Sequence, residues 1–69
     1  MPNSVYKIIE LVGSSPVSWE EAAKNAIARA SETLRDLRIA EVSAMDLHVK
    51  DGEVEFYRTK VKVSFKYES

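Results

Sequence analysis

The sequence of 69 residues contains no cysteine, only two glycines and two prolines, and one histidine. The absence of cysteine excludes disulfides and thiolate metal sites, which are common ways to stabilise a chain this short. A domain of roughly this size buries only about 60% of the surface that its unfolded chain exposes, so a single core is marginal. Association with further copies is the remaining route to stability.

The sequence also lacks an excess of either charge and a long apolar run. Ten basic and eleven acidic residues give a formal net charge of −1, which argues against a domain specialised for nucleic acid or anionic lipid. No apolar segment reaches the length of about 18 residues that a transmembrane helix needs, and no signal-peptide pattern is present. We therefore expect one cytoplasmic domain over residues 1–69 that binds neither nucleic acid nor membrane.

The first half of the chain predicts a strand followed by a helix. Residues 5–12, VYKIIELV, are rich in β-branched and aromatic residues, and the GSSP that follows is typical of a turn. Ser18 and Glu21 have the spacing of a capping box. Apolar residues then recur every three or four positions, which predicts an amphipathic helix over residues 19–37. Its expected buried face consists of Ala23, Ala26, Ile27, Ala30, Leu34 and Leu37.

The second half predicts a hairpin of two long strands, residues 39–50 and 53–67, joined by Asp51-Gly52 in a type I′ turn. Apolar and basic residues alternate along the last strand, which predicts one apolar face and one basic face. At about 3.3 Å per residue this strand spans roughly 50 Å, whereas a helix over 19–37 covers only about 29 Å. Part of the apolar face therefore lacks cover within one chain. We expect an α+β fold of order β-α-β-β whose identical subunits pack across that face.

No complete catalytic or metal-binding motif is present, so we expect no enzymatic activity. His48 has no evident partner and is interpreted as a surface or subunit-contact residue. Residues 13–15, GSS, lack the other residues of a serine elbow or phosphate loop, which leaves a turn or, less favoured, an anion-binding loop before the helix. No EF-hand or other closed set of oxygen ligands exists in one chain, although symmetry would repeat a carboxylate near a rotation axis.

Two further features have alternative interpretations. The basic face of the last strand is interpreted as solvated or paired with acids on neighbouring strands, rather than as a nucleic-acid site, because aromatic residues do not interleave with it. Trp19 begins the predicted helix. We expect it to pack against a neighbouring strand or subunit, with a platform for a ligand as the alternative.

The whole chain resembles the dodecin family. The resemblance lies in the segments VYKIIELVGSSP, AIARASETLR, AEV, DGEVEFYR and VKVSFKYE, which occur in this order with hardly a gap. It implies one helix partly wrapped by a three-stranded antiparallel sheet, and twelve copies assembled through trimeric contacts into a hollow homododecamer. It also implies a protein that holds a ligand rather than an enzyme. Many family members bind riboflavin or FMN as stacked pairs.

The residues that hold flavin in the family differ in this sequence. Ile39 stands where flavin-binding members have a tryptophan, Arg58 where they usually have a glutamine, and Asp46 where they often have a basic residue. Loss of the aromatic plane alone predicts markedly weaker flavin binding. These departures, together with SWEEA at 18–22, resemble the subgroup described as calcium dodecins.

The resemblance therefore makes Ile39, Asp46 and Arg58 the candidate residues of the ligand pocket, and Asp46 the candidate metal ligand, although an ordinary strand-end aspartate without a ligand is the favoured interpretation of Asp46. Arg29 and Arg35 match basic helix positions of the family, where they could meet phosphates or pair with nearby acids. The expected function is a non-enzymatic homododecamer that sequesters a small ligand or Ca²⁺. Flavin storage is the alternative, and a scaffold without a ligand is a third possibility.

Overall fold

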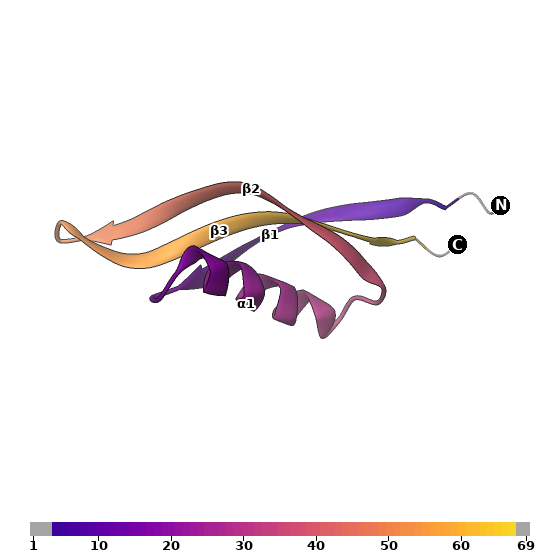
Figure 1. Ribbon diagram of the computed structural model, residues 1–69, viewed down its shortest axis with the longest axis horizontal. Coiled ribbons are helices and arrows are strands. Elements are labelled where there is room, and N and C mark those ends of the chain that lie inside the picture. Colours follow the sequence, from indigo (N-terminus) through magenta and orange to yellow (C-terminus); the bar gives the residue numbers. More distant parts are fainter. Residues whose placement is uncertain (1–3, 68–69) are drawn as a thin grey trace.

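The computed structural model describes residues 4–67. Its elements are β1 (Tyr6–Ser15), α1 (Trp19–Ser31), β2 (Leu37–Lys50) and β3 (Glu53–Lys66). The strands form one antiparallel sheet in the order β1-β3-β2, and α1 lies along one face of it (Figure 1). The predicted α+β fold with β-α-β-β order is confirmed.

Strand β1 continues beyond the end predicted at residue 12. Gly13, Ser14 and Ser15 pair with β3, opposite Thr59, Arg58 and Tyr57. A Cβ atom on Gly13 would overlap the carbonyl group of Ala22, so only glycine lets the strand pass this close to α1. The prediction of a turn at residues 13–15 is wrong, because the glycine serves a close approach rather than a reversal of the chain.

Helix α1 ends earlier than predicted, at Ser31 rather than at residue 37. The backbone N–H groups of Glu32 and Thr33 donate to carbonyl oxygens three residues back, at 3.2 Å each, so the last turn is tightened. Asp36 then adopts a left-handed φ of 57°. The chain reverses there, and Leu37 starts β2 opposite Phe65. Beyond residue 31 the apolar period continued through Leu34, which is half-buried in the turn after α1, and Leu37, which packs against the core after this reversal.

The start of α1 contains half of the predicted capping box. Ser18 Oγ accepts a hydrogen bond from the Glu21 N–H at 3.0 Å, as expected for an N-cap. The Glu21 carboxylate instead accepts a hydrogen bond from Ser15 Oγ at 2.6 Å. Ser15 is only 1% exposed, and its hydroxyl also accepts from the Val17 N–H at 2.9 Å. The buried hydroxyl thereby joins the end of β1 to the first turn of α1.

The core of one subunit is small. Its buried apolar residues are Ala22, Ala26, Ala30, Val61 and Val63. The helix contributes only alanines to this set, and their spacing differs from the predicted face in that Ala22 is buried whereas Ala23 and Ile27 are partly exposed. The alternation predicted for β3 is confirmed, because Val61 and Val63 are buried while the basic residues between and beside them are exposed.

The β2–β3 hairpin projects well past α1 (Figure 1). Asp51 and Gly52 at its tip have φ values of 54° and 77°, which fits the predicted type I′ turn. The molecule is 54 Å long, and every residue of β2 after Leu37 is exposed. The predicted lack of cover over the hairpin is confirmed for one subunit. Within residues 4–67, no helix has the length and apolar character needed to cross a membrane.

Candidate functional site

Asp46 on β2 and Arg58 on β3 form a two-pronged ion pair. The two residues lie opposite each other in the strand register. Arg58 Nε donates to Asp46 Oδ1 and Arg58 Nη2 donates to Oδ2, both at 2.7 Å. Such charge-assisted, bidentate pairs are the strongest class of side-chain hydrogen bond. The Arg58 side chain is 47% exposed and that of Asp46 54% exposed, so the pair lies at the surface.

Each member of the pair stabilises the charged form of the other. The hydrogen bond from Arg58 lowers the pKa of Asp46, desolvation partly opposes this shift, and the positive charges of Arg58 and Lys60 lower the pKa further. The same hydrogen bond raises the pKa of Arg58. Asp46 is therefore a carboxylate over the whole physiological range, and its charge already has a partner within the subunit.

Trp19 connects the start of α1 to this part of the hairpin. Its Nε1 donates to the backbone oxygen of Asp46 at 3.1 Å, and its ring meets the ring of Tyr57 edge to face, with centroids 5.1 Å apart. Thr59 Oγ1 donates to the Trp19 backbone oxygen at 2.9 Å. These contacts confirm the interpretation that Trp19 packs against a neighbouring strand.

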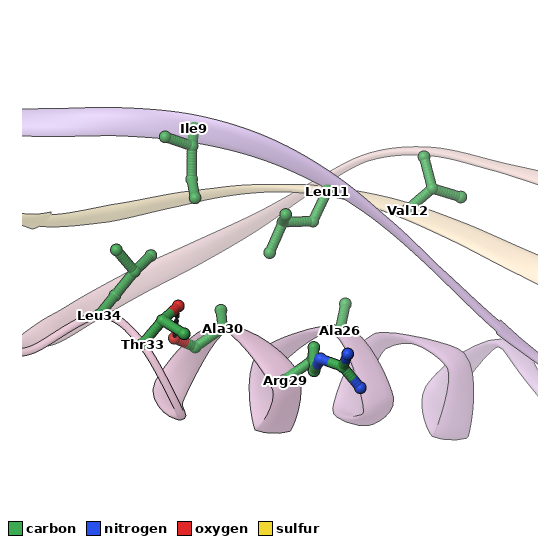
Figure 2. Close-up of a pocket in the computed structure, with 8 residues that line it drawn as sticks. All are labelled: Ile9, Leu11, Val12, Ala26, Arg29, Ala30, Thr33 and Leu34. Atoms are coloured by element: carbon green, nitrogen blue, oxygen red, sulfur yellow. Dashed lines mark hydrogen bonds between the residues drawn. The ribbon is translucent and has the colours of Figure 1, made fainter.

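Two open pockets flank α1. One of about 330 Å³ lies between α1 and β2 and includes Trp19, Val42 and Met45 in its lining. The other, of about 250 Å³, lies between α1 and β1, and its lining is aliphatic apart from Thr33 and Arg29, whose side chain lies beside the helix (Figure 2). Each pocket has an apolar wall that a single subunit leaves open.

Ile39 lies apart from the ion pair. Its side chain is 67% exposed, and it pairs with Ser64 on β3. Ser64 is six residues from Arg58 along the strand, which corresponds to about 20 Å. The structure thus brings Asp46 and Arg58 together, whereas Ile39 lines a separate open pocket of about 140 Å³, which also includes Ile27 and Val63. The assignment of these three residues to a ligand stays a prediction.

The sequence did not reveal that Asp46 and Arg58 are partners. Counting from the turn, where Val49 pairs with Val54, a regular hairpin would place Asp46 opposite Tyr57. An irregularity between His48 and Val49 shifts the register by one residue and moves Arg58 into that position. A bulge of this kind has no single residue signature, so the spacing from Asp51-Gly52 alone does not lead to Arg58 as the partner.

The nearest acid to His48 was also missed. His48 Nδ1 lies 2.9 Å from Glu55 Oε1, and the His48 ring packs against Phe56 with centroids 6.0 Å apart. The predicted surface position of His48 is confirmed, since its side chain is 54% exposed.

The two basic residues predicted to lie on the helix differ in position. The Arg29 guanidinium lies 3.8 Å from the Glu32 carboxylate. This contact favours ion pairing for Arg29, while Arg35 lies beyond the end of α1.

The described part of one chain does not gather the acidic or histidine side chains of a metal site. Ca²⁺ takes six to eight oxygen ligands. Across residues 4–67, no cluster of three or more His, Asp or Glu side chains is placed to hold a metal ion. Both carboxylate oxygens of Asp46 are engaged by Arg58.

Comparison with known proteins agrees with this geometry. The model of the family described as Dodecin matches residues 5–68, and the chain belongs to the dodecin family. Calcium dodecin from Mycobacterium tuberculosis is 46% identical over 63 residues, which cover 91% of this chain and 89% of the relative.

Solved structures show the same fold. Dodecin from Streptomyces coelicolor superposes with a TM-score of 0.93 at 38% identity, covering 100% of this chain and 99% of that chain. The crystal structure of the M. tuberculosis calcium dodecin, described as a calcium chelating antigen with a novel calcium-binding site, superposes with a TM-score of 0.85 at 45% identity. It covers 94% of this chain and 93% of that chain.

Proposed function

We propose that this chain is a non-enzymatic, ligand-holding protein of the dodecin type, which assembles into a homododecamer through trimers and sequesters Ca²⁺. The observation that carries the proposal is the uncovered hairpin. Val42, Met45 and Val49 are each more than half exposed on β2. A contiguous apolar surface on a small protein marks an interaction site. Other copies of the same chain are the partner that the family relationship supports.

The sheet edge adds to this argument. Strand β2 pairs with β3 on one side and has no strand on the other within residues 4–67. A long edge strand with apolar residues aggregates unless a specific contact covers it. A closed assembly of identical subunits covers every such edge in the same way. It would also close the apolar pockets on either side of α1. A cysteine-free chain suits the cytoplasm, where we place this assembly.

Calcium is the favoured ligand because of the 46% identity to a calcium dodecin. In an assembly with rotational symmetry, one carboxylate near an axis is repeated by each copy, which supplies oxygen ligands that one chain lacks. Asp46 is the candidate, since its side chain is exposed and ionised. Flavin storage stays the alternative, although Ile39 offers no aromatic plane for a ring to stack on.

Thermal unfolding of the purified protein tests the proposal. We expect CaCl₂ to raise the midpoint of unfolding, and EDTA to reverse the rise, because an ion that binds only the folded state stabilises it by mass action. MgCl₂ is the matched control, since Mg²⁺ is smaller and demands stricter geometry. Quenching of riboflavin fluorescence on addition of the protein would instead support flavin storage. No response to either ligand would support a scaffold without a ligand.

A further inference from the structure

The tip of the β2–β3 hairpin, residues 49–55, lies beyond the start of α1 at one end of the 54 Å molecule (Figure 1). The pocket between α1 and β1, here called the α1–β1 groove, is lined by residues from the second half of the helix and the turn after it. We propose that the hairpin tip of one copy docks into the α1–β1 groove of the next copy, head to tail, so that three copies close a ring. This inference rests on the proposed assembly and names the surfaces that meet within its trimers.

A chain cannot fill its own groove with its own tip. The tip projects past Trp19 at the start of α1, whereas the groove is bordered by Ala30, Thr33 and Leu34 at the opposite end of the helix (Figure 1). Strands β2 and β3 are paired from Leu37 through to the turn, so the tip does not fold back along the helix. A tip that occupies the groove therefore belongs to a second copy.

The groove suits small aliphatic side chains. Its volume of about 250 Å³ is below the range of roughly 300–1,000 Å³ that is typical of sites for small molecules. Ile9, Leu11 and Leu34 point into it (Figure 2). At the tip, Val49 and Val54 pair with each other across the two strands and are 58% and 48% exposed. Two adjacent valines on a projecting hairpin form an apolar knob, and the groove removes such a knob from water.

The charges around the knob distinguish between the two grooves that flank α1. Three acids accompany a single lysine within residues 49–55, namely Asp51, Glu53 and Glu55 with Lys50. The charged residue in the lining of the α1–β1 groove is Arg29, whose side chain is 87% exposed and only 3.8 Å from Glu32. An exposed pair of this kind is weak, so Arg29 is available to an acid of another copy. The pocket between α1 and β2 has Glu20 in its lining instead, which would repel an acidic tip.

The contact joins two different surfaces, so it is heterologous. Contacts of this type either close into a ring or continue into a filament, depending on the rotation between neighbours. A ring of three uses every tip and every groove, and it matches the trimers of the proposed assembly. It covers the exposed end of the hairpin and the open side of α1 with one repeated contact.

Disulfide cross-linking of the assembled protein tests the contact. The parent has no cysteine, so introduced thiols are the only ones present. A chain with both Val54→Cys and Thr33→Cys carries one thiol on the tip and one at the groove. After oxidation with diamide, we expect a ladder of one, two and three chains on a non-reducing gel, because a disulfide requires Cβ atoms within roughly 3.5–4.5 Å. Val54→Cys with Glu20→Cys is the matched control, and it should remain largely a single chain.

Charge reversal gives a second, independent measurement. Arg29→Glu should raise the concentration needed for assembly at least about tenfold, because an acidic groove then faces an acidic tip. Glu53→Lys should also raise it, and the two changes together should bring it back to within about threefold of the parent. Lys24→Glu makes the same charge change at an exposed position of α1 outside both pocket linings. It should alter assembly by less than about twofold, measured by size-exclusion chromatography over a dilution series.

The outcomes separate this inference from the proposed function. A ladder that ends at two chains or continues past three overturns the ring of three. Cross-linking of the Glu20→Cys control as strong as that of the Thr33→Cys pair, or no rescue by the double charge reversal, overturns the choice of groove. Each of these results leaves the assembly of the parent in place. A parent that elutes as a single chain would end the inference and the proposed assembly together.

Discussion

The carbonyl group of Ala22 on α1 lies against Gly13 on β1, in the space where a side chain would begin. A Cβ atom built on Gly13 would come within 2.9 Å of the Ala22 carbonyl carbon and 3.1 Å of Ala26 Cβ. The absence of a side chain sets how closely the helix approaches the sheet. Since the buried face of α1 consists of alanines, this close approach is what allows so slim a helix to cover the sheet.

Gly13→Ala should therefore be strongly destabilising. We expect a loss of at least about 2 kcal/mol in the free energy of unfolding, because the new methyl group meets backbone that cannot move without shifting α1. Gly52→Ala is the matched control. It has open space around it but a φ of 77°, so its cost should be about 1 kcal/mol. Urea unfolding at one fixed protein concentration measures both, and equal costs would contradict the close-approach argument.

The long elements could be predicted from the sequence, and the positions where they end could not. The alternation along β3 and the Asp51-Gly52 turn are local signals, and both were correct. The end of β1 was misplaced because the sequence does not distinguish two reasons for a glycine. Gly13 is required by the close approach of α1, and a turn would require a glycine in the same way. The end of α1 was misplaced because the apolar period continued through a reversal at Asp36.

The candidate site was predictable only as a set of residues. Asp46 and Arg58 stood out because each departs from the family pattern, but their pairing depends on a bulge between His48 and Val49 that no local signal announces. Ile39 was grouped with them by resemblance, although it lies elsewhere on the sheet. Relationships between residues on different strands depend on register, and register is set by the whole hairpin.

A second prediction concerns the hydrogen bonds of the buried Ser15 hydroxyl. Its hydroxyl donates to the Glu21 carboxylate and accepts from the Val17 N–H, so Ser15→Ala removes both of these part-buried hydrogen bonds. We expect a loss of about 1 to 3 kcal/mol in unfolding free energy. Ser14→Ala, a change in the exposed residue beside it, should cost less than about 0.5 kcal/mol. A smaller effect at Ser15 than at Ser14 in chemical denaturation would be inconsistent with this hydrogen-bond network.

The ion pair predicts a pH dependence. Arg58 lowers the folded-state pKa of Asp46 below the ordinary aspartate value, so its contribution to stability is fully present above the unfolded pKa of about 3.9. That contribution is lost as the pH falls through the folded pKa. Carbon NMR titration of the Asp46 carboxyl should give a raised pKa in Arg58→Gln. An identical Asp46 pKa in parent and variant would rule out Arg58 as the cause.

A charge on the uncovered face of β2 should prevent assembly. Val42 is 51% exposed and pairs with the buried Val61. In Val42→Glu, a carboxylate would have to be desolvated at the subunit contact, so we expect at least a tenfold rise in the concentration needed for assembly. Ala28→Glu introduces the same charge on the exposed side of α1. Size-exclusion chromatography over a dilution series compares them, and an unchanged assembly of Val42→Glu would show that this face is not a contact.

Sedimentation velocity of the unmodified protein at micromolar concentration tests the central claim most directly, namely that one copy of the chain leaves too much apolar hairpin uncovered to be the folded unit. We expect one closed species of twelve copies of the 7.8 kDa chain, about 94 kDa in all. Dilution should convert it to unfolded chain rather than to a folded subunit. A stable single chain that unfolds cooperatively at that concentration would contradict the account.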